Sequence, residues 1–159
     1  MGSVLNGFED DKGPKFFVWT SRDPNAGWLQ RAQIIKGWVE GGQSREKIYD
    51  VACSDGLSPD PKTHRCPNNE AKVNLSNCSV TSDRGNVMLK AVWRDPDFSP
   101  QEHAYYYVRV LENPSCRWST WDAIRLGIEP NPDLAATHQE RAWSCLLYTS
   151  DAADDVECV

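Results

Sequence analysis

The sequence predicts a mainly β fold: an antiparallel β-sandwich that is incomplete, with long loops and one short helix. Apolar and aromatic residues recur in runs of strand length, and clusters of Pro, Asp, Asn and Gly separate those runs. Only one stretch carries both a start and a stop signal for a helix. Strands that follow one another without interleaved helices favour a sandwich over an α/β sheet.

The first three strands are expected over 15–20, 29–39 and 46–53. The first is rich in aromatic and β-branched residues, which favour strands. The glycine pair at 41–42 predicts a hairpin between the second and third strands, with a connection longer than the two-residue minimum. In the second strand one face is mainly apolar, because Ala32, Ile34 and Trp38 alternate with Arg31, Gln33 and Ile35.

Residues 54–72 are dense in Pro, Asp, Asn and Gly and are expected to form a long loop. Further strands are expected over 86–93, 103–111 and from 141 onward. The single helix is expected over 119–126, ending at a glycine. In the fourth strand one face is expected to carry Val87, Leu89, Ala91 and Trp93, and in the fifth Tyr106, Val108 and Val110 share a face.

The last fifteen residues, 145–159, match translated sequencing adapter rather than natural protein. A transposon-end library adapter read as TGT CTC TTA TAC ACA TCT GAC GCT GCC GAC encodes the ten residues from Cys145 to Asp154. We therefore expect residues 145–159 to be an adapter-derived tail and exclude them from fold reasoning. The alternative is a native acidic tail. Because 145–149 is apolar and rich in β formers, it is still expected to adopt a strand by chance.

Without the four acidic residues of this tail, the formal charge of −6 becomes −2. Lys and Arg are scattered singly among acids, so no nucleic-acid partner is expected. No apolar run approaches the roughly 20 residues that a membrane-spanning helix needs, so no membrane partner is expected either.

Four cysteines remain outside the tail: Cys53, Cys66, Cys78 and Cys116. An even number, concentrated around one loop, is typical of disulfides in an exported protein, and four cysteines allow three pairings. A zinc site of Cys53, His64, Cys66 and Cys78 is the alternative, although the sequence has no tight Cys-x2-4-Cys pair. Unpaired thiols are the third possibility.

Three stretches carry a family resemblance: Val-Trp-Thr-Ser-Arg-Asp-Pro-Asn at 18–25, Leu-Gln-Arg-Ala-Gln-Ile-Ile-Lys-Gly-Trp at 29–38, and the tyrosine-rich run with Cys-Arg-Trp-Ser-Thr-Trp-Asp at 105–122. On these stretches the chain resembles the C-terminal region of the bacterial domain-of-unknown-function family 3604. The resemblance covers about residues 1–144. It implies that 1–144 is a partial C-terminal β-sandwich domain of a larger protein, which lacks the family's closing strand.

Proteins of this family are several times longer, and their N-terminal part resembles metal-dependent hydrolases of the polymerase-and-histidinol-phosphatase superfamily, with a Gly-Asp-Leu-His-x-His opening. The resemblance implies phosphoesterase-like hydrolysis by divalent metal in a missing N-terminal half, which would be the partner of this domain. His64, His103 and His138 stand singly here, so no catalytic residue and no metal ligand can be transferred. A periplasmic or secreted location is expected for the parent protein.

Arg117, Trp118, Trp121 and Asp122 form the densest candidate site, as a ligand rim or a domain interface. The alternative is that the two tryptophans cover the end of the sandwich as part of its core. A second candidate group consists of Asp95, Asp97, Glu102 and His103. The Asp-Pro-Asp sequence is typical of a turn, which explains these residues better than metal ligation does.

Two functions fit these features best, and a third, a self-sufficient enzyme, would need several acids and histidines that converge in one cleft. The first is an accessory domain that packs on the hydrolase and has no activity alone. The second is a carbohydrate- or peptide-binding module without catalysis. The placement of four tryptophans separates them, because an exposed planar row favours sugar binding and a buried or interface-like patch favours the accessory role: Trp38, Trp93, Trp118 and Trp121.

Overall fold

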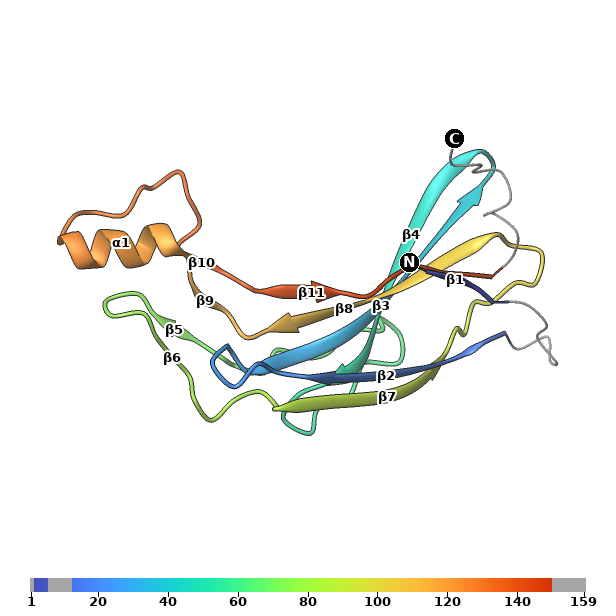
Figure 1. Cartoon of the computed structure of the whole chain (residues 1–159), viewed down its shortest axis with the longest axis horizontal. Helices are drawn as coiled ribbons and strands as arrows, with labels where there is room; N and C mark the ends of the chain where they lie inside the picture. The colour runs from blue at the N-terminus through green and yellow to red at the C-terminus, as the bar shows by residue number, and fades with distance from the viewer. Residues whose placement is uncertain (1, 6–12, 150–159) are drawn as a thin grey trace.

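The computed structural model describes residues 2–5 and 13–149, which fold into two facing β layers with one helix beyond their end (Figure 1). The larger layer has the strand order β1 (Ser3–Val4), β12 (Leu147–Tyr148), β8 (Ala104–Glu112), β3 (Leu29–Glu40), β4 (Gln43–Cys53), and β11 (Arg141–Trp143) also pairs with β8. The smaller layer is the antiparallel pair β2 (Lys15–Ser21) and β7 (Met88–Arg94). The predicted incomplete, mainly β sandwich is confirmed.

Two short strand pairs and one helix lie outside these layers. They are the pair β5 (Val73–Asn74) and β6 (Ser79–Val80), the pair β9 (Ser115–Cys116) and β10 (Thr137–His138), and the helix α1 (Trp118–Leu126). The pairings within the large layer are antiparallel except for β1 with β12, which is parallel.

The apolar core lies between the two layers. Each long strand contributes residues to it. Burying one large apolar side chain contributes about 1.5–3 kcal/mol to folding. Phe16 of β2 and Tyr106 of β8 meet across the layers with ring centroids 4.8 Å apart. The cluster consists of Phe16, Val18, Leu29, Ala32, Ile34, Ala52, Leu89, Ala104 and Tyr106.

Strand β3 lies between β8 and β4 in the larger layer, and side chains on both of its faces are buried. Ile34 and Ile35 point to opposite faces, yet they are 1% and 0% exposed. The polar residues Gln33 and Lys36 are buried as well. The apolar face expected from alternation is therefore present, but the opposite face is not solvated.

The predicted connection between β3 and β4 is wrong in length. Glu40 pairs directly with Gln43, which leaves Gly41 and Gly42 as a two-residue turn. Both glycines have positive φ, 59° and 76°, as the tight primed turns of hairpins require. Strand β4 starts three residues before the predicted position, because the polar residues that begin it extend a hairpin that is exposed to solvent.

Strand β7 begins at Met88, and Leu89, Ala91 and Trp93 face the core as predicted. Val87 does not share that face: it precedes the strand and is 54% exposed. The predicted strand therefore begins two residues too early, because Val87 belongs to the connection that enters β7.

The long loop after β4 is fixed to the face of β3–β4 that points away from the core. Asp50, whose side chain is fully buried, accepts hydrogen bonds from Gln33 Nε2 at 2.6 Å and from the backbone N–H of Cys66 at 2.7 Å. Arg31 Nη1 pairs with the same carboxylate at 2.9 Å. A buried charge with this many partners is compensated.

Two disulfides join the four cysteines, Cys53 with Cys66 and Cys78 with Cys116. The first closes the long loop onto the end of β4, and the second ties the turn before β6 to β9. These bonds use the three sulfur atoms of the alternative zinc set, so no thiolate remains there.

The tail is described only as far as Thr149. Leu147 and Tyr148 form β12 and pair with Tyr106 and Tyr105 of β8, the strand expected there from the β propensity of 145–149. The rest of the predicted adapter-derived tail, 150–159, lies outside the described residues. Within the described part of the chain, the one helix is too short to cross a membrane.

Candidate functional site beside helix α1

Helix α1 lies beyond β9 and β10, away from the β3–β4 hairpin (Figure 1). It follows Arg117, whose extended backbone (φ −65°, ψ 146°) marks the N-cap, although no side chain caps the first turn. Gly127 ends it in the left-handed conformation (φ 65°), and its N–H reaches the carbonyls of Ala123 and Ile124. The helix predicted over 119–126 is confirmed.

Few contacts attach α1 to the rest of the domain. The Thr120 hydroxyl donates to the Ala136 carbonyl at 2.8 Å, and the Arg117 N–H donates to the same oxygen at 3.0 Å. Ala123 is a buried residue of the helix, and the Cys78–Cys116 disulfide lies just before the helix. Its position is therefore set by backbone bonds and a disulfide rather than by a large apolar face.

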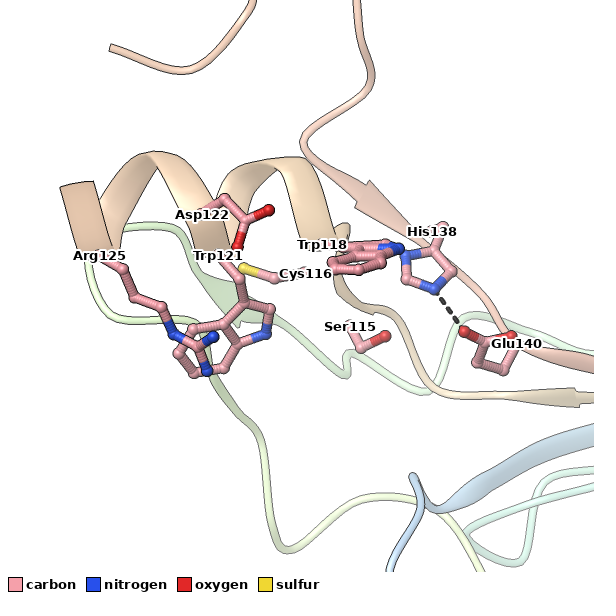
Figure 2. Close-up of a pocket in the computed structure, with 8 residues that line it drawn as sticks. All are labelled: Ser115, Cys116, Trp118, Trp121, Asp122, Arg125, His138 and Glu140. Carbon is pink, nitrogen blue, oxygen red and sulfur yellow. Dashed lines mark hydrogen bonds and ion pairs between the residues drawn. The ribbon is translucent and has the colours of Figure 1, made fainter. Parts of the chain in front are cut away.

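An open cavity of about 380 Å³ lies between α1 and the β9–β10 pair. Trp118 and Trp121 supply its apolar surface and remain 68% and 38% exposed. Figure 2 shows the arrangement, with Arg125 lying over Trp121 on one side and a histidine–glutamate pair on the other. The lining residues are Ser115, Cys116, Trp118, Trp121, Asp122, Arg125, His138 and Glu140.

The polar groups of the cavity are paired as follows. His138 Nε2 lies 2.6 Å from Glu140 Oε1, and the Arg125 guanidinium lies 5.5 Å from the centre of the Trp121 ring. The other ring nitrogen of His138, Nδ1, is shielded and has no hydrogen-bond partner in the described residues. Ser115 faces His138 across the β9–β10 pair.

No hydrogen bond joins Ser115 to His138 among the contacts of the described residues. A nucleophile activated by its base requires that bond or a close approach to it. The cavity offers aromatic stacking surface, one cation and two carboxylates, groups that can bind a ligand.

Three of the four residues predicted as a candidate site line this cavity: Trp118, Trp121 and Asp122. Arg117 is exposed at the start of the helix and lies outside the lining. Neither tryptophan belongs to the apolar core cluster between the two layers.

The sequence-based prediction missed the rest of the lining. Arg125 follows Trp121 by four residues on the predicted helix, a spacing that could have been recognised. His138 and Glu140 could not, because the β9–β10 pairing that brings them to the cavity joins residues more than twenty positions apart.

The other two discriminating tryptophans lie elsewhere. Trp38 and Trp93 are half-buried and pack against the core, and Trp93 lies 4.9 Å from Tyr49, centroid to centroid. The four tryptophans therefore do not form one exposed row.

The acidic turn after β7 surrounds a lysine. Lys36 of β3 is 2% exposed, and its ammonium lies 2.9 Å from Asp95 and 2.5 Å from Glu102. Burial alone would lower the lysine pKa, but the two carboxylates outweigh burial and raise it, so the side chain stays charged. Asp97 lies at the edge of this cluster, where the ion pair with Lys47 lowers its pKa.

The turn chemistry expected here is present, because Asp95 Oδ1 accepts the backbone N–H of Asp97 at 2.9 Å. Tyr106 donates its hydroxyl to the other oxygen of Asp95 at 2.7 Å. In the described residues, no group of three or more His, Cys, Asp or Glu side chains is arranged to hold a metal ion.

Residues 1–150 match a family model described as "Protein of unknown function (DUF3604)". The matched range ends within the predicted adapter-derived tail. No curated protein and no solved structure matches the chain.

Proposed function

The chain belongs to the DUF3604 family of proteins of unknown function, and we propose that residues 1–144 are an accessory C-terminal β domain of a larger metal-dependent hydrolase. On this proposal the domain packs on a catalytic domain of the same protein, shapes the entrance to its site, and has no activity alone. The divalent metal and its ligands belong to that catalytic domain, and the chemistry is phosphoesterase-like hydrolysis.

The exposed apolar surface around α1 is the observation that carries the proposal. Trp118, Leu126 and Ile128 are 68%, 71% and 59% exposed, and all three lie on α1 or just after it. Large apolar side chains exposed close together in the sequence are a common feature of interaction sites. Tryptophan and arginine are the residues that most often carry binding energy at interfaces, and both line the cavity.

The two disulfides support an exported parent protein, since such bonds persist in the periplasm and outside the cell.

A carbohydrate- or peptide-binding module is the second candidate, and the cavity itself favours it. Trp118 and Trp121 offer rings for stacking, and Asp122, Arg125 and Glu140 offer hydrogen bonds to hydroxyl or amide groups. This function needs free access to the cavity, whereas the accessory role needs the α1 surface to be covered.

The test is hydrogen exchange of residues 118–128 in the longer protein and in this chain alone. The accessory role predicts that amides of α1 exchange at least about ten-fold more slowly in the longer protein, because a covering domain restricts local opening. Amides of the distant β3–β4 turn at 41–42 serve as the internal control and should be unchanged. Equal exchange of α1 in both proteins, together with binding of sugars or peptides that Trp118→Ala abolishes, would favour the binding module.

A further inference from the structure

Among residues 2–5 and 13–149, strand β2 has a free edge: it pairs with β7 on one side and with no strand on the other, in a two-stranded layer. The N–H of Arg22 donates to the Val87 carbonyl at 2.9 Å, which fixes the phase of the ladder. Since backbone groups alternate in direction along a strand, Phe16, Val18 and Thr20 bond to β7.

The intervening residues of β2 therefore direct their N–H and C=O groups to the open side. These are Lys15, Phe17, Trp19 and Ser21, and no strand pairs with them among the described residues. Unpaired backbone groups in a row are a template for another strand.

Two of these four residues also have large aromatic side chains that are exposed to solvent. Phe17 and Trp19 are 66% and 65% exposed on the outer face of β2, and Val92, the partner of Phe17 on β7, is 70% exposed. Lys90 lies over the Trp19 ring, 5.0 Å from its centre. The outer face is thus apolar and aromatic at the strand that has the open edge.

We propose that two copies of this chain form a two-fold symmetric dimer by antiparallel pairing of β2 with β2. Only the register centred on Val18 uses all four outward residues. It places Phe17 opposite Trp19 of the second copy and Lys15 opposite Ser21, with each relation repeated by the two-fold axis. Each of the four residue pairs exchanges two hydrogen bonds, so about eight form across the interface.

Charge and side-chain complementarity favour a second copy of this chain as the occupant. In this register Lys15 has Trp19 of the second copy as a diagonal neighbour, so a cation meets an aromatic ring. No like charges stand directly opposite each other. The aromatic pair of Phe17 with Trp19 is repeated twice, and such cross-strand pairs are among the more stabilising ones.

A groove beside the open edge would be covered by the same pairing. It is a cavity of about 340 Å³ between β2 and β11, lined in part by Val18, Val108, Val110 and Ala142. The second copy's β2, about 5 Å from the first, lies across its mouth. The dimer therefore buries apolar surface as well as satisfying backbone groups.

Sedimentation of the 159-residue chain over a range of concentrations tests this inference, which is independent of the proposed function. We expect a monomer–dimer equilibrium. Phe17→Pro should weaken it at least about ten-fold, because it removes an outward N–H on each strand together with the ring. The β2–β7 ladder does not use that N–H and stays intact. Trp118→Ala is the matched control, an exposed tryptophan on α1, and should leave the equilibrium unchanged.

Amide exchange supplies a second readout that needs no variant. Raising the concentration should protect the amides of Phe17 and Trp19, while those of Val18 and Thr20 are protected at every concentration. A chain that stays monomeric, a dimer that Phe17→Pro does not weaken, or a species larger than a dimer overturns the inference.

Discussion

Replacing Lys36 with methionine removes the one cation at the centre of the buried acidic turn. The Lys36 side chain is 2% exposed and that of Asp95 is fully buried, with their charged atoms 2.9 Å apart. Methionine fills a similar volume, so the change removes the charge and leaves the packing nearly intact.

The expected loss of stability depends on the partners that Asp95 keeps after Lys36 is replaced. Breaking a buried ion pair from one side leaves an uncompensated charge, which costs about 3–5 kcal/mol. Asp95 keeps the hydrogen bonds from Tyr106 and from the backbone N–H of Asp97, so we expect the lower end, about 3 kcal/mol. The double variant with Asp95→Asn should recover part of this loss, because no unpaired carboxylate is then buried.

Urea unfolding with both disulfides intact measures these free energies. The matched control is Lys47→Met, since Lys47 is the direct cross-strand partner of Lys36 and pairs with Asp97 at the exposed side of the same turn. Because the side chains of Lys47 and Asp97 are 40% and 52% exposed, Lys47→Met should lower the free energy of unfolding by less than about 1 kcal/mol. If Lys36→Met cost no more than Lys47→Met, the buried ion pair would not stabilise the turn as argued.

Three further outcomes are expected. Replacing Cys78 with serine should lower the free energy of unfolding by about 4 kcal/mol, and replacing Cys53 by about 3 kcal/mol, because the two disulfides span 38 and 13 residues. Urea unfolding of oxidised samples measures both losses. Burial raises the pKa of Glu112, so its ionised form opposes folding above the ordinary pKa of 4.5. Glu112→Gln, which can still accept the N–H of Gly27, should raise the melting temperature at pH 7 and lose that gain below about pH 4. Trp118→Ala should change the stability of this chain by less than about 0.5 kcal/mol, and a larger loss would place its ring in the core.

Local patterns predicted the elements well where burial follows a simple period. Tyr106, Val108 and Val110 of β8 share the face toward the core, as predicted, and α1 ends at Gly127, where a left-handed residue is needed. The two-residue turn at 41–42 could also have been predicted, because two glycines suit the positive φ angles of a primed hairpin turn. The exposed polar start of β4 concealed it, since those residues lack strand propensity.

Non-local contacts set the limit of the sequence-based prediction. In the sequence, Lys36 is one of several polar residues of β3, and only the fold brings it to Asp95 and Glu102, about sixty residues later. In the same way, the far wall of the α1 cavity comes from His138 and Glu140, which reach it through strand pairing.

The most direct test of the proposed origin and function is the nucleotide sequence that encodes Trp143 to Val159, together with the DNA on either side of the gene. We expect adapter codons from Cys145 onward. If the proposed function is right, the upstream reading frame is continuous with Met1 and encodes a Gly-Asp-Leu-His-x-His motif. Unrelated codons for 145–159 in independent reads would show that the tail is native. An upstream frame without that motif would contradict the assignment of this domain to a metal-dependent hydrolase.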